Sequence, residues 1–296
     1  MTEFDVPSGA PARVATPEPG DPRLARLSLN QRTTAGWSLA EVVDGAVRAG
    51  LPAIGVWREP LAEVGTTAGA QLIRDAGLRV SSLCRGGFLT DPSTSSASLD
   101  DNRRALDEAA ALGAPTLVLV PGGLPAGDHD LAGARARFAE ALAALAPDAH
   151  TLGVTLAIEP MHPIYAADRG VVSTLAQALE IAAQFDPADV GVVVDTFHLW
   201  WEPRLLETIA LTGERIASFQ VGDWITPLPP DALLARGMMG DGHIDFAPIA
   251  RAVTAACYTG DIEVEIFNAD VWAAPGDEVV ATLARRYVEL VQPFVG

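Results

Sequence analysis

Four oxygen-bearing side chains stand where apolar, strand-like segments of the sequence end. The segments and residues are GVTLAIEP with Glu159, VGVVVDTFH with Asp195, RIASFQVGD with Gln220 and DIEVEIF with Glu265. The intervals of 36, 25 and 45 residues are each long enough for a strand, a loop and a helix. Side chains delivered at the same end of successive parallel strands can therefore meet at one point.

Three carboxylates and one amide oxygen form a set of hard ligands for a cation. The set predicts one divalent metal ion of the Mn²⁺, Mg²⁺ or Co²⁺ class, and it is also compatible with Zn²⁺. Any one of these residues alone is equally consistent with a solvated strand end or a helix cap. Their common position at four strand ends favours a shared metal site.

Two glutamates alternate on the last of these segments, so Glu263 and Glu265 face the same side of the strand. Glu265 lies nearer the carboxyl end and is the predicted ligand. Glu263 lies one layer deeper, where we expect a buried ion pair with an arginine or a supporting contact. Glu159 and Glu265 are also the predicted acid–base residues.

Two histidines follow predicted ligands at the same interval. His198 comes three residues after Asp195, and His162 comes three residues after Glu159. Imidazole exchanges protons near neutral pH. We therefore predict that His198 takes part in catalysis and that His162 contacts substrate, although each is also consistent with an ordinary loop histidine.

Further polar and aromatic residues follow predicted strand ends. Arg85 in CRGG and Arg236 in RGMMGDG are expected to bind a substrate hydroxyl, keto oxygen or carboxylate. Trp37 and Trp224 are expected to wall the substrate pocket. For each of them, loop packing is the alternative role.

The longest irregular stretch, residues 222–245, carries both Trp224 and Arg236. A loop of this length at the mouth of a barrel predicts a lid that closes over substrate. The alternative is an oligomer contact, for which Met238 and Met239 provide apolar surface.

Eight strand-like runs recur along the chain with alanine- and leucine-rich segments of helical periodicity between them. They lie near residues 25–30, 52–57, 79–84, 115–120, 153–158, 190–195, 215–221 and 261–266. This alternation predicts a single-domain α/β fold, a (β/α)8 TIM barrel over residues 24–296. An open doubly wound sheet is the rival. Residues 1–23, rich in Pro, Ala and Gly, are expected to form a disordered tail.

Composition excludes several functions. A net charge of −18 argues against binding to nucleic acid or anionic membranes. The 20 basic residues are all arginine, so lysine Schiff-base and PLP chemistry are excluded. No apolar run reaches membrane-spanning length. Two isolated cysteines, Cys84 and Cys257, suggest a reducing compartment, and we expect a cytoplasmic protein.

The sequence resembles the xylose isomerase-like TIM barrels, a superfamily of sugar isomerases and epimerases, over about residues 24–293. The resemblance rests on LAIEP, VVVDTFH, FQVGD, GDGHIDF and YTGDIEVEIF. It implies that Glu159, Asp195, Gln220 and Glu265 bind one metal ion and that His198 lines the substrate site. Many ketose epimerases of the superfamily have histidine where this chain has Gln220. Glutamine there looks more like the 3-dehydroshikimate dehydratases and some keto-sugar lyases.

The resemblance implies a metal-dependent isomerase or epimerase that acts on a keto- or hydroxy-sugar or related polyol. The reaction would begin with proton abstraction next to a carbonyl and pass through an enediolate. A lyase that shares this first step is the alternative, either a dehydratase or a keto-glycoside lyase. A non-catalytic sugar-binding protein or partner subunit is the alternative of a different class, and a homo-oligomer stays open. Endonuclease IV belongs to the same superfamily, but five histidines and the negative charge argue against DNA repair.

Overall fold

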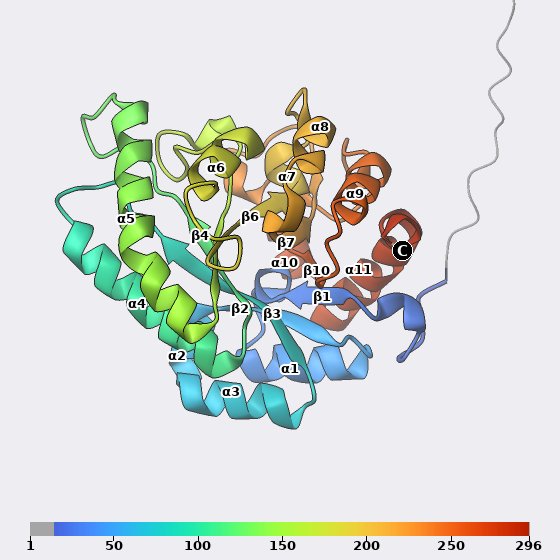
Figure 1. Cartoon of the computed structure of the whole chain (residues 1–296). Helices are drawn as coiled ribbons and strands as arrows, with labels where there is room; N and C mark the ends of the chain where they lie inside the picture. The colour runs from blue at the N-terminus through green and yellow to red at the C-terminus, as the bar shows by residue number, and fades with distance from the viewer. Residues whose placement is uncertain (1–14, 296) are drawn as a thin grey trace, which may run out of the picture.

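The parallel strands of the chain close into an eight-stranded barrel. The computed structural model describes residues 15–295. The order around the barrel is β1-β10-β7-β6-β5-β4-β3-β2, with every neighbouring pair parallel. The predicted TIM barrel is confirmed, and the rival open sheet is wrong because β1 pairs with β10. Figure 1 shows the helices around the outside of the strands.

All eight predicted strand regions form barrel strands. Their bounds are Leu27–Asn30 (β1), Ala53–Trp57 (β2), Arg79–Gly87 (β3), Thr116–Val120 (β4), Thr155–Ile158 (β5), Val190–Asp195 (β6), Ile216–Val221 (β7) and Ile262–Val264 (β10). The short strands Asp223–Trp224 (β8) and Arg236–Gly237 (β9) pair with each other as a separate antiparallel ribbon.

The α-helices cover the barrel between the strands. They are Leu39–Arg48 (α1), Arg58–Val64 (α2), Thr66–Asp75 (α3), Ser95–Leu112 (α4), Leu131–Leu152 (α5), Leu175–Ala182 (α6), Thr196–Leu199 (α7), Leu205–Ala210 (α8), Phe246–Ala255 (α9), Ala269–Ala273 (α10) and Gly276–Leu290 (α11). Short 3-10 helices lie at Pro22–Leu24 (η1), Gln31–Thr34 (η2), Pro163–Tyr165 (η3), Gly213–Arg215 (η4), Ala232–Leu234 (η5) and Gln292–Phe294 (η6). Within residues 15–295, no helix is both long and apolar enough to cross a membrane.

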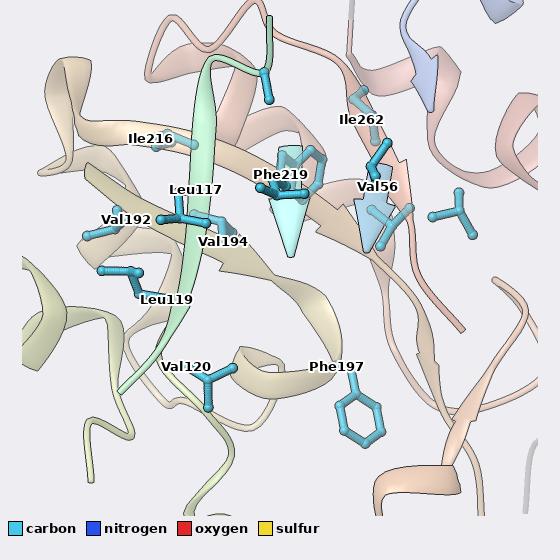
Figure 2. Packing of buried hydrophobic residues seen from close by; sticks show 14 of the residues in the cluster. Val56, Leu117, Leu119, Val120, Val192, Val194, Phe197, Ile216, Phe219 and Ile262 are labelled. Atoms are coloured by element: carbon cyan, nitrogen blue, oxygen red, sulfur yellow. The ribbon is translucent and has the colours of Figure 1, made fainter. Parts of the chain in front are cut away.

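Strand residues alternate between two apolar layers. Leu117 and Leu119 of β4 and Val192 and Val194 of β6 pack in the large cluster between strands and helices, part of which Figure 2 shows. Val118, between the two leucines, belongs to a smaller cluster with Val193, Ala157, Trp57 and Phe267. A period of two assigns this smaller cluster to the barrel interior. The next inward positions on β5 and β6 are therefore those of Glu159 and Asp195.

Part of the predicted tail belongs to the described chain. Residues 1–14 lie outside the described residues. Asp21 caps η1 through the backbone N–H of Arg23. A side chain at Gly50 would clash with the backbone of Pro19 and Gly20, so this segment packs closely against the start of β2.

One buried aspartate holds the long segment after β7. The carboxylate of Asp223 accepts hydrogen bonds from the backbone N–H groups of Trp224, Gly240, Gly242 and Ile244 at 2.8–2.9 Å. Glycine is required at 242 because a Cβ there would lie 2.1 Å from the carbonyl oxygen of Trp224. The predicted lid is thus a braced ribbon, and it holds Arg236 in a fully buried position.

We predict that Asp223→Asn loosens this segment. The amide retains one acceptor oxygen and loses the other, which leaves two buried N–H groups unsatisfied and costs about 1–3 kcal/mol. Urea unfolding measures the loss, and limited proteolysis within residues 222–245 reports the loosening. Asp231→Asn is the matched control, because this exposed residue only caps η5 in the same segment. Equal stability and equal cleavage of the two variants would contradict the role given to Asp223.

Candidate metal centre and active site

A cavity of about 190 Å³ opens at the carboxyl ends of the barrel strands. Glu159, Glu265, His198 and Arg236 line it together with the aromatic side chains of Trp57 and Phe267. A larger groove of about 520 Å³ lies outside the barrel, between α8 and α9. The cavity in the barrel is the candidate active site, because the buried acidic side chains meet there.

An arginine lies among the predicted metal ligands. One terminal nitrogen of Arg236, Nη2, is 2.8 Å from Asp195 Oδ2, 3.1 Å from Glu265 Oε2 and 3.2 Å from His198 Nε2. Arg236 is 2% exposed and Asp195 is 0% exposed. The guanidinium group also lies over the ring of Phe197, 4.6 Å from its centroid. In the described chain, Arg236 therefore neutralises part of the carboxylate charge directly.

The amide of Gln220 has a fixed orientation. Its Nε2 donates to Glu263 Oε1 at 3.4 Å, and a carboxylate can only accept, so the nitrogen must face Glu263. Gln220 Oε1 is buried and accepts no hydrogen bond from any residue that the structure describes. An unsatisfied buried acceptor is costly unless a cation or water takes it. Together with the neighbouring carboxylates, this free oxygen fits a divalent metal ion.

Glu263 differs from the expected ion pair. It pairs with no arginine in residues 15–295; Asn30, Ser81, Ser82 and Gln220 donate hydrogen bonds to it instead. Burial raises the pKa of Glu263, and these donors oppose that rise. These hydroxyl and amide donors stabilise the buried carboxylate of Glu263, a role that we had expected an arginine to fill.

Asn30, at the end of β1, was not predicted from the sequence. Its Nδ2 donates to Glu263 Oε1 at 2.5 Å and to Glu265 Oε1 at 3.0 Å. Its Oδ1 accepts from the indole of Trp57 at 2.9 Å. Asn30 thus fixes Glu265 and the aromatic wall together. The sequence gives one local signal for Asn30, which is that a polar residue ends a predicted strand. No acidic residue or histidine beside it suggests a site.

His198 is buried and oriented by the chain. Both polar neighbours of its ring are donors, and a neutral ring accepts at only one nitrogen, so it bonds to one of them. The backbone N–H of His162 lies 3.2 Å from Nδ1, and Nη2 of Arg236 lies 3.2 Å from Nε2. That nitrogen lies 3.9 Å from both Glu159 Oε1 and Asp195 Oδ2. Burial lowers the pKa of His198 to about 3, and the positive charge of Arg236 acts in the same direction. His198 therefore lines the cavity as a neutral ring.

Burial also shifts the two predicted acid–base residues. It raises the pKa of Glu159 well above its usual range, and the charges of Glu265 and Asp195 raise it further. Burial raises the pKa of Glu265 to about 8, against the opposing effect of Arg236. Oxygen and nitrogen atoms of Glu159, Asp195 and His198 lie within 4.8 Å of one another, close enough to hold a metal ion.

The predicted substrate contacts fall in different places. Arg85 and Arg236 line the cavity. His162 and Trp224 lie beside it: their rings pack on each other 4.6 Å apart, and Trp224 stacks on Phe197. Trp37 does not line the cavity, and it packs against Gly45 of α1 and Gly276 of α11.

Met238 and Met239 are 4% and 0% exposed, so they belong to the core of this chain. The oligomer contact that we considered for residues 222–245 therefore lacks the apolar surface on which it depended.

Comparison with known proteins identifies the family to which this barrel belongs. Residues 43–288 match the family described as xylose isomerase-like TIM barrel. The chain belongs to this family.

Individual proteins differ in their similarity to the chain. A crystal structure of a protein from Sinorhizobium meliloti 1021 has a TM-score of 0.87 at 46% identity, covering 90% of this chain and 98% of that one. An L-ribulose 3-epimerase of Mesorhizobium japonicum is 29% identical over 46% of this chain and 41% of its own. A 3-dehydroshikimate dehydratase of Pseudomonas aeruginosa is 31% identical over 49% of this chain and 23% of its own. The chain thus spans less than half the length of these two curated relatives.

We predict that Arg236→Met destabilises the metal-free chain by about 3–5 kcal/mol, because it leaves buried carboxylates without their partner. A divalent ion would replace the lost charge, so the loss should be smaller with Mn²⁺. Urea unfolding in EDTA and in Mn²⁺ measures both values. Arg204→Met, which removes an exposed arginine paired with Glu207, is the control. An equal loss in EDTA and Mn²⁺ would show that the cation does not share the carboxylates with Arg236.

Proposed function

We propose that the protein is a divalent-metal-dependent isomerase or epimerase acting on a keto- or hydroxy-sugar or related polyol. The observation that carries this proposal is the pair of buried carboxyl groups, Glu159 and Glu265, which line one small cavity from separate strands. Two proton-exchanging groups on different sides of a bound carbon can remove a proton and return one. Membership of the xylose isomerase-like family supports the same reaction class.

The proposed metal ligands are Glu159, Asp195, Gln220 and Glu265. A bound Mn²⁺, Mg²⁺ or Co²⁺ ion would act as a Lewis acid that polarises a substrate carbonyl, and Zn²⁺ is also compatible with these ligands. Gln220 can offer only its oxygen, because Glu263 holds its nitrogen. Glu263 and Asn30 therefore set the orientation of two proposed ligands, Gln220 and Glu265.

Proton transfer falls to the two glutamates. Glu159 or Glu265 removes the proton next to the carbonyl, and the other glutamate or His198 returns one. His198 and Arg236 line the same cavity, and the guanidinium group is placed to stabilise negative charge on the substrate oxygens of an enediolate. Trp57, Phe267 and Met161 form apolar walls that exclude water from it.

The fate of the enediolate defines three related activities. Return of the proton to the same carbon gives epimerisation, and return to the neighbouring carbon gives isomerisation. Loss of a group at the β position gives a lyase, either a dehydratase or a keto-glycoside lyase. Gln220 and the similarity to a 3-dehydroshikimate dehydratase favour the lyase as the second candidate; the similarity to an L-ribulose 3-epimerase favours the first.

We predict that the Mn²⁺-loaded protein exchanges a carbon-bound hydrogen of a keto-sugar or keto-polyol with solvent deuterium. A panel of ketoses, inosose and 3-dehydroshikimate, followed by NMR, covers the three activities. Glu159→Gln and Glu265→Gln should each slow the exchange at least about 100-fold, because neither amide can take the proton.

Glu202→Gln is the control, a half-buried glutamate that accepts from the backbone of Leu175 away from the cavity. If both active-site variants exchanged deuterium as fast as Glu202→Gln does, the proposed reaction would be rejected.

A further inference from the structure

Three arginines from separate elements line the outer part of the cavity. They are Arg32 of η2, Arg85 of β3 and Arg169 in the segment between η3 and α6, and we call them the rim arginines. The chain carries 38 acidic and 20 basic residues, so its surface is predominantly acidic. A concentration of positive charge at one opening of such a protein calls for a physical reason.

The backbone holds each rim arginine in place. Arg85 is the extra residue of a bulge, because Cys84 pairs with Val118 and Gly86 with Leu119. Asn102 of α4 clamps that bulge through both its amide atoms, which bond to the N–H and carbonyl of Gly87.

The other two rim arginines are tied to strand ends. The N–H of Arg32 donates to Asn30, and the carbonyl of Arg169 accepts from Gly122 just after β4. The three guanidinium groups are therefore presented at the mouth by fixed backbone.

The rim arginines are only partly neutralised. Arg85 forms no ion pair with any residue from 15 to 295, and its guanidinium lies over the ring of Phe88 at 4.4 Å. Arg32 is 3.1 Å from Glu59, whose side chain is 55% exposed. Arg169 is 3.7 Å from Asp168, whose side chain is 65% exposed. Exposed pairs of this kind contribute little.

Bracing of the loops does not explain this arrangement. Where the chain uses arginine as a brace, the guanidinium bonds directly to the backbone, as Arg135 does to Val171 and Arg215 to Val190 and Phe185. Arg85 makes no such bond within the described residues. Burial lowers the pKa of Arg85, the charge of Glu59 opposes this fall, and the charges of Arg169 and Arg32 add to it, so the three arginines lie close enough to affect one another.

We infer that the substrate carries an anionic group, a carboxylate or a phosphate ester, which the rim arginines bind while its carbonyl end faces Glu159 and Glu265. A planar guanidinium suits either group, since both accept paired hydrogen bonds. The cavity of about 190 Å³ limits the substrate to one small ring or chain. The inference rests on the proposed function for the carbonyl end, and it narrows the substrates to sugar acids or sugar phosphates.

Three ketoses that differ at one carbon test the inference: D-fructose, D-fructuronate and D-fructose 6-phosphate. Calorimetry on the Mn²⁺-loaded protein gives their dissociation constants, which require no turnover. Wild type is compared with Arg85→Met and Arg85→Lys. Arg204→Met, which removes one exposed positive charge elsewhere, is the control, and thermal unfolding confirms that each variant is folded.

We expect at least one anionic ketose to bind wild type about 10-fold or more tightly than D-fructose. Arg85→Met should reduce that ratio by about 10-fold, Arg85→Lys should reduce it less, and Arg204→Met should preserve it. Preference for D-fructuronate identifies a carboxylate site, and preference for D-fructose 6-phosphate identifies a phosphate site.

Equal binding of neutral and anionic ketoses, a ratio that survives Arg85→Met, or no binding of either anionic ketose would overturn the inference. Deuterium exchange separates it from the proposed function. Anion-dependent binding without exchange in any keto compound rejects the reaction and leaves the anion site standing. Exchange in D-fructose with no preference for an anion rejects the anion site and leaves the reaction standing.

Discussion

The structure depends on how three carboxylates are kept together inside a closed barrel. Glu159, Asp195 and Glu265 are all almost fully buried, and burial together with the neighbouring carboxylates raises the pKa of Glu159 and Glu265. Arg236 supplies one compensating charge in the described chain. The hydrogen bonds of Asp223 and the pairing of β8 with β9 fix the backbone that carries this arginine. A divalent ion would supply the remaining charge, and we propose that it shares the carboxylates with Arg236.

The proposed site is built across neighbouring strands of the barrel. Glu263 lies in register with Gln220, which in turn lies in register with Asp195. The carboxylate of Glu263 accepts hydrogen bonds from amide and hydroxyl donors. One of these donors is Nε2 of Gln220, so the oxygen of Gln220 faces away from Glu263. Positive charge returns at the rim, where Arg32, Arg85 and Arg169 lie. The cavity therefore passes from a basic mouth to an acidic floor, which suits a substrate with an anionic end and a carbonyl end.

Strand periodicity was sufficient to predict the barrel and the four strand-end positions, because apolar runs of parallel strands and their final polar residues are local features. The ends of the helices depend less on the local sequence. α4 begins at Ser95 without a side-chain cap, and α5 continues through Pro147 to Leu152 and packs along α4. Asn30 and Arg169 could not be assigned from sequence, since their roles come from contacts with residues far away in the chain. Arg236 was predicted to reach the site, but its pairing with Asp195 depends on the braced ribbon.

Anomalous diffraction at the manganese edge, from crystals grown with Mn²⁺, tests directly whether Glu159, Asp195, Gln220 and Glu265 bind one divalent ion. We expect one strong anomalous peak bounded by carboxylate oxygens of Glu159, Asp195 and Glu265 and by Oε1 of Gln220, with Nη2 of Arg236 moved away from Asp195. A metal site shared with Arg236 would be contradicted if saturating Mn²⁺ gave no peak among these four residues and Arg236 kept its 2.8 Å contact with Asp195.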